Sequence, residues 1–311
     1  MLKYKSSLAK PEKNLNRSSV WAYIFCAPFI IGYFLFSLFP IMYSFFISFF
    51  DWNGVGDKLF VGVKNYITIF TRDPLFYKSL TNTLLIMLMS TPVEIILGML
   101  LAVVLFNMKK GKSFFQTANF LPYITTPVAI GFIFAYLFDW NNGYVNLVLI
   151  KIGILHEGIY WLQEPATARM VVALMIIWKY LGYFMTIYLA GMTSIPEEIY
   201  EAAKVDGANP FKTFIKITLP LLKNITAFLL VTSVIGGLQM FDEPSLLYSW
   251  GERSYVGGPD NSVLTVVWKF YNDAFKSDSM LGYGSAISFS LFAIIIVFSF
   301  ISYRISAGKE V

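Results

Sequence analysis

Residues 194–220 read SIPEEIYEAAKVDGANPFKTFIKITLP, a polar and charged stretch between two strongly apolar runs. Ser194 and Glu197 have the S-x-x-E spacing of a helix capping box, and Pro196 falls in the first turn, where a missing N–H costs nothing. An apolar stripe at helical spacing follows, on Ile195, Ile199, Ala202 and Ala203. The sequence therefore predicts a short amphipathic helix whose glutamates lie off the apolar stripe.

A turn and a second short helix complete this stretch. Asp206-Gly207 predicts a sharp reversal, because glycine adopts a positive φ without a steric cost. Asn209-Pro210 has the pattern of a helix cap followed by a first-turn proline, and Leu219-Pro220 is expected to close the second helix. We therefore predict a helix–turn–helix elbow (the elbow, residues 194–220) at a membrane surface. An ordinary amphipathic connector is the alternative interpretation of its shape.

The chain around the elbow has the composition of a multi-span membrane protein. Of its 311 residues, 57% are hydrophobic and 14% are charged, whereas a soluble domain has about 45–50% and about 25%. The apolar run 21–50 exceeds the roughly 7–15 residues of a signal-peptide core, so it is expected to span the membrane. Further spans are expected at residues 80–106, 118–138, 170–192, 224–240 and 281–302. The prediction is an all-α protein with six transmembrane helices.

The distribution of charge predicts how these spans are oriented. The tail 1–20, the loops 107–116 and 194–223 and the C-terminal tail together carry 14 basic and six acidic residues. The remaining loops, 51–79, 139–169 and 241–280, carry nine basic and twelve acidic residues. Because cytoplasmic loops carry the excess of Lys and Arg, both termini and the elbow are expected in the cytoplasm. The expected organisation is a basic tail (1–20), a six-span domain (21–305) and a short tail (306–311).

Several classes of site are not supported by the sequence. The single Cys26 lies in an apolar run and the single His156 in a loop, so neither a disulfide framework nor a metal site is predicted. The net charge of +5 is weak evidence for nucleic acid. Gly111-Lys112-Ser113 ends like a P-loop, but Phe106 stands where its first glycine is required. No catalytic or nucleotide site is predicted, so active transport requires a partner or an ion gradient.

Two ionisable residues lie within the predicted spans and are functional candidates for that reason. Glu94 belongs to the second span and Lys179 to the fourth. In one interpretation they pair and join the two spans; in the other, Lys179 lies in a substrate pathway beside Trp178 and Tyr180.

The end of the fifth span is the second candidate region for substrate. Gln239, Asp242 and Glu243 offer hydrogen-bond acceptors next to the ring of Phe241, a mixture suited to binding a polyol. The polar end of a helix is the alternative. The predicted outer loops also contain tryptophans that suit either an interfacial belt or stacking on sugar rings: Trp52, Trp140, Trp161, Trp250 and Trp268.

The elbow also carries residues at fixed spacing. Glu201-Ala202-Ala203 is followed by three residues ending in Asp206, then Gly207, then nine residues and Ile217-x-Leu219-Pro220. This pattern resembles the EAA signature of ABC-transporter membrane subunits in binding-protein-dependent importers. The resemblance implies that the elbow is a cytoplasmic coupling helix that docks into a cleft on an ATPase subunit.

Other segments resemble the sugar-permease branch, which includes the maltose-type importers. They are Asn82-Thr83, opening the second span, Leu121-Pro122, opening the third, Phe241-Asp242-Glu243, Gly257-Gly258-Pro259, and Gly282-Tyr283-Gly284-Ser285-Ala286, opening the sixth. The large periplasmic insertion of the maltose importer's longer subunit is absent. A binding protein is therefore expected to dock on the shorter outer loops.

The resemblance implies a type I ABC importer permease in the cell membrane of a prokaryote, moving an oligosaccharide or related polyol by alternating access. The implied partners are a second permease subunit, two ATPase subunits that bind ATP and Mg²⁺, an extracytoplasmic binding protein and membrane lipid. One alternative substrate is glycerol-3-phosphate, although Lys179 is the single basic residue within a predicted span. An ion-coupled secondary transporter and a non-transporting scaffold are more distant alternatives.

Overall fold

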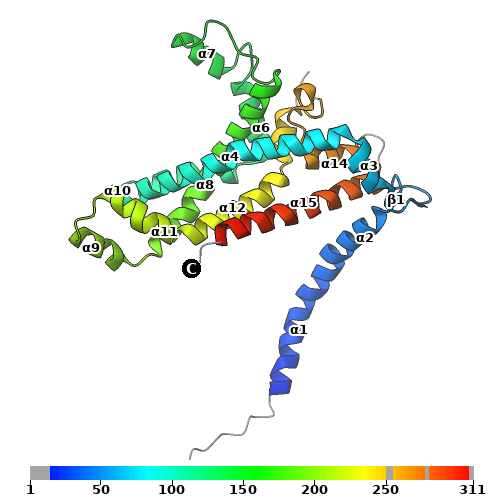
Figure 1. The fold of residues 1–311 in the computed structure, drawn as a ribbon, viewed down its shortest axis with the longest axis horizontal. Coiled ribbons are helices and arrows are strands. Elements are labelled where there is room, and N and C mark those ends of the chain that lie inside the picture. The colour runs from blue at the N-terminus through cyan, green and yellow to red at the C-terminus, as the bar shows by residue number, and fades with distance from the viewer. Residues whose placement is uncertain (1–14, 250–254, 277–279, 308–311) are drawn as a thin grey trace, which may run out of the picture.

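The computed structural model describes residues 15–249, 255–276 and 280–307 and is almost entirely helical (Figure 1). Within these residues, β1 (Phe50–Asp51) and β2 (Leu59–Phe60) form a two-stranded antiparallel sheet in which Phe50 lies opposite Phe60. Trp250 and most of the N-terminal tail lie outside the described residues.

Four stretches of helix are long and apolar enough to cross a membrane. The first runs from Trp21 to Ile47 through α1 (Leu15–Tyr33), the π-helical η1 (Phe34–Leu38) and α2 (Phe39–Ile47). The others are α4 (Pro74–Asn107), α8 (Pro165–Thr193) and α15 (Leu281–Ala307).

Two bent helix pairs are long and apolar enough for each pair, counted together, to make one further span. α5 (Lys112–Ile124) and α6 (Pro127–Leu137) meet at 96°. The segment Pro210–Leu221 meets α12 (Lys223–Leu238) at 62° and comprises α10 (Pro210–Thr213), the π-helical η2 (Phe214–Thr218) and α11 (Leu219–Leu221). Counting each bent pair once brings the total to the six spans predicted.

The break in the third span corrects the prediction of one helix over 118–138. Thr125 and Thr126 have extended backbones, with ψ of 143° and 135°. Pro127 explains this, because proline disfavours the helical conformation of the residue before it. Leu121-Pro122 therefore lies near the end of α5 rather than at the opening of a span.

Short helices connect the spans. They are α3 (Lys64–Arg72), α7 (Tyr144–Lys151), α9 (Glu197–Val205), α13 (Asp242–Leu247), the 3₁₀ helix η4 (Pro259–Asn261) and α14 (Val266–Phe275). Figure 1 shows α9 to α11 and the C-terminal end of α15 at one end of the bundle, and α3, β1 and α14 at the other. The arrangement separates the elbow from these outer loops as predicted; the side of the membrane on which each lies stays a prediction.

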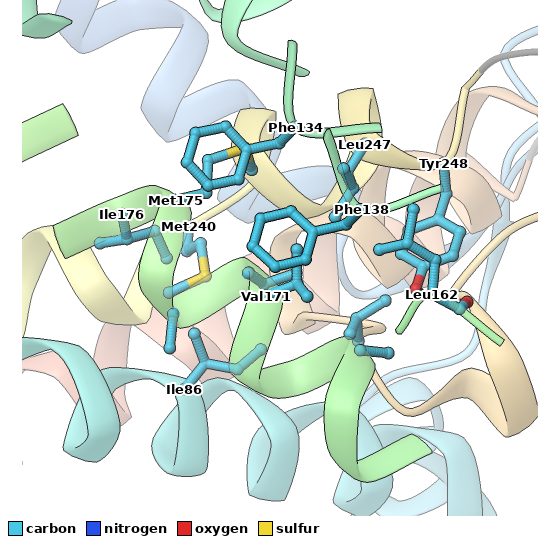
Figure 2. Close-up of a cluster of buried hydrophobic side chains, with 14 of the residues drawn as sticks. Ile86, Phe134, Phe138, Leu162, Val171, Met175, Ile176, Met240, Leu247 and Tyr248 are labelled. Carbon is cyan, nitrogen blue, oxygen red and sulfur yellow. Dashed lines mark hydrogen bonds between the residues drawn. The ribbon is translucent and has the colours of Figure 1, made fainter. Parts of the chain in front are cut away.

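One cluster of the core lies where α4, α6, α8 and the segment around α13 meet. Figure 2 shows Phe134 of α6 and Phe138, the residue after that helix, packed with Met175 of α8 and Met240, above Ile86 of α4. Small residues let the spans approach, as is usual between membrane helices. A Cβ at Gly98 of α4 would lie 2.5 Å from the Cβ of Phe184 on α8, so only glycine fits this helix crossing.

Two of the outer tryptophans belong to this core. Trp161 and Trp268 are 9% and 7% exposed. Trp161 Nε1 donates to Asn146 Oδ1 at 2.7 Å. For these two side chains, the interpretations as an interfacial belt and as stacking platforms for sugars are both wrong. Trp140, by contrast, is 42% exposed and stacks on Tyr160 with ring centroids 5.1 Å apart.

Asn82 and Thr83 lie inside α4 rather than at the opening of the span, because the helix begins at Pro74. Both are buried and hold the loop before α14. Asn82 Nδ2 donates to the carbonyls of Asn261 and Leu264 at 2.7 and 3.1 Å, and Thr83 Oγ1 accepts from the N–H of Val266 at 3.2 Å. Their role in this structure is to fix a loop 180 residues away in sequence to the second span.

A cluster of charges joins α4, α14 and α15 at the end of the bundle opposite the elbow. Asp73 caps α4 and accepts hydrogen bonds from Tyr283 at 2.6 Å and from Lys269 at 2.9 Å. Lys269 also pairs with Asp273 at 2.7 Å. Burial alone would raise the pKa of Asp73, but the hydrogen bonds from Tyr283 and Lys269 and the charge of Lys269 hold it below its usual value.

Candidate functional site

A cavity of about 520 Å³ opens between α4, α5, α8, α12 and α13 (the central cavity). Its size falls within the range of small-molecule sites, about 300–1,000 Å³. Aromatic rings supply much of its wall, from Tyr123, Tyr180, Tyr183, Phe184 and Phe241. Hydroxyl groups of α4 and α12 line it as well: Ser90, Thr91, Thr232 and Ser233. Flat rings beside hydrogen-bonding groups suit a ligand that has both apolar faces and hydroxyls.

The backbone between α12 and α13 leaves helical geometry at this cavity. α12 ends at Leu238, and Phe241 has φ of −139° before α13 begins at Asp242. Irregular backbone at membrane depth is tolerated where it lines a cavity. This break directs Gln239, Phe241, Asp242 and Glu243 to the cavity wall. The structure thus brings together every candidate residue predicted from the end of the fifth span.

Lys179 and Glu243 form a buried ion pair at the cavity. Lys179 Nζ of α8 lies 2.7 Å from Glu243 Oε1 of α13, and both side chains are 9% exposed. The Tyr180 hydroxyl donates to the same oxygen at 3.4 Å. The predicted pairing of Lys179 with Glu94 is therefore wrong, because a carboxylate 64 residues further along the chain holds the ammonium group.

Glu94 lines the same cavity from α4 but stands apart from this ion pair. The residue is 3% exposed, and its Oε1 has no hydrogen-bond partner within the described part of the chain. A buried polar atom without a partner costs about 1–3 kcal/mol. Such an atom on a cavity wall indicates that a ligand or water hydrogen-bonds there.

Several cavity residues were not predicted from the sequence. The hydroxyl groups of Ser90, Thr91, Thr232 and Ser233 lie within apolar spans and carry no charge that would single them out. Tyr123 and Tyr183 stack on each other, with ring centroids 5.0 Å apart, and both line the cavity. A search for small polar residues in apolar helices would have found the hydroxyls, but not which helix faces they share.

The elbow forms the second candidate site. α9 ends at the predicted turn, where Gly207 has φ of +73°. In the described structure, a Cβ placed on Gly207 would meet no atom within 4 Å, so the backbone conformation alone requires glycine. Asn209 caps α10 as predicted, because its Oδ1 accepts from the N–H of Lys212 at 2.8 Å.

Two local predictions for the elbow are wrong. Ser194 does not cap the start of α9, because it is the C-terminal cap of α8 and its hydroxyl donates to the carbonyl of Gly191 at 2.7 Å. Pro196 occupies the cap position of α9, without a side-chain hydrogen bond. Leu219-Pro220 does not close the second helix, which continues to Leu221, because proline is tolerated in the first turn of α11.

The surface of the elbow mixes apolar and acidic groups. Ala203 is buried, whereas Ala202 is exposed and so does not belong to a buried stripe. Val205 and Phe211 are 87% and 74% exposed, on a segment otherwise rich in charge. The remaining signature residues that reach the surface are Glu201, Asp206, Leu219 and Pro220, while Ile217 is half-buried. Exposed apolar side chains beside carboxylates form a surface suited to a protein partner with a basic rim.

Residues 76–309 match the family described as the binding-protein-dependent transport system inner membrane component. The chain is 36% identical to the arabinooligosaccharides transport system permease protein AraP of Bacillus subtilis, covering 92% of this chain and 88% of that protein. It is 35% identical to the lactose transport system permease protein LacF of Rhizobium radiobacter, covering 95% and 99%.

A solved structure shows the same fold. It belongs to a bacterial ABC transporter involved in the import of the acidic polysaccharide alginate, and matches with a TM-score of 0.81 over 96% of this chain and 99% of that chain. The two sequences are 23% identical.

Proposed function

This chain belongs to the family of binding-protein-dependent transport system inner membrane components, and we propose that it is the membrane-spanning subunit through which an ATP-driven importer moves a sugar. The proposed substrate is an oligosaccharide or related polyol, delivered by an extracytoplasmic binding protein. The central cavity carries the proposal, because it offers aromatic rings, hydroxyls and carboxylates between the spans. Relatives named for arabinooligosaccharide and lactose transport support the sugar class.

The proposed transport requires no covalent chemistry from this chain. ATP and Mg²⁺ would be bound by two partner ATPase subunits that dock on the elbow. Docking there is supported by the exposed Glu201, Val205 and Phe211. ATP-driven approach of the ATPase subunits would move the elbow, and the 62° junction with α12 would pass that movement to the helix that ends at the central cavity.

The first span supports a second permease subunit as a partner. Its most apolar window within Trp21–Ile47 has no residue buried against the described part of the chain, and Figure 1 shows α1 extending away from the other spans. Phe25, Phe29 and Phe36 are each about four-fifths exposed. In the proposed assembly, lipid covers part of the exposed surface of this helix and the partner permease covers the rest.

The cavity favours a sugar over glycerol-3-phosphate. A phosphate group requires Arg or Lys donors. Among the described residues lining the cavity, Lys179 is the one cation, and Glu243 already occupies it at 2.7 Å. An ion-coupled transporter is disfavoured by the family to which the chain belongs.

Reconstitution tests the proposal. The chain would be co-expressed with its partner permease, ATPase and binding protein, purified and placed in liposomes with ATP inside. We expect uptake of a neutral oligosaccharide that requires both ATP and the binding protein. Uptake that persists without ATP and stops when the ion gradient is collapsed would instead establish a secondary transporter.

A further inference from the structure

The described wall of the central cavity holds more carboxyl groups than cations. Three carboxyl groups line it, from Glu94, Asp242 and Glu243, against the single ammonium group of Lys179. Lys179 is committed to Glu243, so two carboxyl groups are left without a cation among the described residues of the cavity wall. A substrate that enters therefore meets acceptors rather than charged donors.

Glu94 lies where its carboxyl group can accept a hydrogen bond from a substrate in the cavity. The residue is almost fully buried on α4, and its Oε1 lacks a hydrogen-bond partner within the described residues. Asp242 also lines the cavity, from the start of α13, and is exposed. The two carboxyl groups come from α4 and α13 and line one cavity, where water screens charge less than at an open surface.

From this arrangement we infer that the central cavity is selective for charge: it accepts neutral sugars and amino sugars and excludes sugars that carry a carboxylate, a sulfonate or a phosphate. Glu94 and Asp242 accept hydrogen bonds from sugar hydroxyls or from an ammonium group. An anionic group brought beside them meets the charge of the exposed Asp242, and the described residues of the cavity wall offer no free cation to compensate it. This inference rests on the proposed function and defines the substrate class within it.

Matched open-chain derivatives separate charge from shape, because the aldonate and the aminated sugar both lose the ring at the reducing end. The complete transporter in liposomes is first given neutral di- and trisaccharides of glucose, galactose and arabinose. Each sugar that is carried is then presented as its aldonate, in which the reducing end is oxidised to a carboxylate, and as its reductively aminated derivative. Uptake is measured at concentrations that saturate the binding protein with each compound, so that delivery to the membrane subunit is equal.

The variants are chosen to remove charge while keeping hydrogen bonding. Glu94→Gln and Asp242→Asn are made singly and together, and Asp57→Asn, on the exposed loop between β1 and β2, is the matched control. Recovery of the ATPase on purification shows whether the complex has assembled. If the double variant does not assemble, the uptake of each sugar is measured with the single variants.

We expect the wild type and Asp57→Asn to carry the neutral and aminated sugars at least about tenfold faster than the aldonate, because unit charges interact strongly in a partly buried site. Removing the two carboxylates should reduce this gap to about threefold or less. Equal uptake of neutral sugar and aldonate by the wild type would overturn the inference alone, and so would an unchanged gap in the variants. If no sugar of any charge is carried, the proposed function itself fails.

Discussion

Lys179 Nζ and Glu243 Oε1 lie 2.7 Å apart and join the fourth span to the helix that follows the fifth. Losing one partner leaves an unpaired charge in a buried site, which typically costs about 3–5 kcal/mol. We expect Lys179→Met and Glu243→Gln each to lower the unfolding temperature of the purified complex. This temperature is measured by size-exclusion chromatography of heated samples. The double variant should be more stable than either single variant. If the double loses as much as both singles together, the pair contributes no coupling.

The end of the fifth span should act in transport rather than in assembly. Gln239, Phe241 and Asp242 line the central cavity, and Asp242 is exposed. Alanine at each position should lower sugar uptake while the amounts of subunit and co-purified ATPase stay at wild-type levels. Variants that fail to assemble would identify this segment as a structural helix end, and variants that transport normally would remove it from the pathway.

Gly207 should be required for docking of the ATPase. Its φ of +73° costs a residue with a side chain about 1–2 kcal/mol, and each 1.4 kcal/mol changes an equilibrium about tenfold. Gly207→Val should therefore insert normally yet lose the ATPase on purification, together with uptake. Glu201→Lys should do the same by reversing an exposed charge. Lys64→Ala, an exposed lysine of α3, is the control; if both elbow variants retain the ATPase, the elbow is a connector.

The charge distribution of the loops predicts an orientation that labelling can test. Single cysteines would replace Lys110 or Lys212 on one side and Asp57 or Glu157 on the other, in a Cys26→Ala background. All four positions are exposed. In intact cells, a membrane-impermeant thiol reagent should modify the Asp57 and Glu157 positions and spare the others. Modification at the Lys212 position from outside would reverse the orientation and exclude docking of a cytoplasmic ATPase on the elbow.

Asp73 should contribute stability that depends on pH. Because its folded pKa lies below the usual 3.8, the contribution is complete above that pH and is lost as pH falls through the folded value. Asp73→Asn should thus lower the unfolding temperature at pH 7, and the difference from wild type should shrink below pH 3.8. A constant difference would show that the charge of Asp73 does not account for the effect, because Asn can still cap α4.

Local patterns were sufficient for much of the fold. Apolar runs located the spans, and Asp206-Gly207 and Asn209 marked the turn and the cap that the structure contains. Pro127 carried a signal of the same kind, since the extended residue before it breaks the third span. Its effect was not predicted because the run 118–138 contains no charged residue that would mark a boundary within it.

The candidate site was predictable in part for a different reason. Its charged and acceptor residues stand out within apolar segments, so Glu94, Lys179 and the segment 239–243 were found without the structure. Their pairing was not found, because the partner of Lys179 is set by how α8 and α13 pack across 64 residues of chain. Sequence spacing within one helix carries no information about that contact.

The ion pair also has a consequence for biosynthesis. Lys179 is synthesised 64 residues before Glu243, an interval of roughly 3 to 13 seconds at ribosomal rates of about 5–20 residues per second. During that interval the fourth span must reach the bilayer, or wait in the insertion machinery, with its ammonium group lacking its final counter-ion. Glu94 is the acidic residue already present in the earlier spans, and it faces the same space that Lys179 will line. While the chain between Lys179 and Glu243 is being synthesised, Glu94 is therefore the acidic residue in the spans already made that can lie near the ammonium group of Lys179.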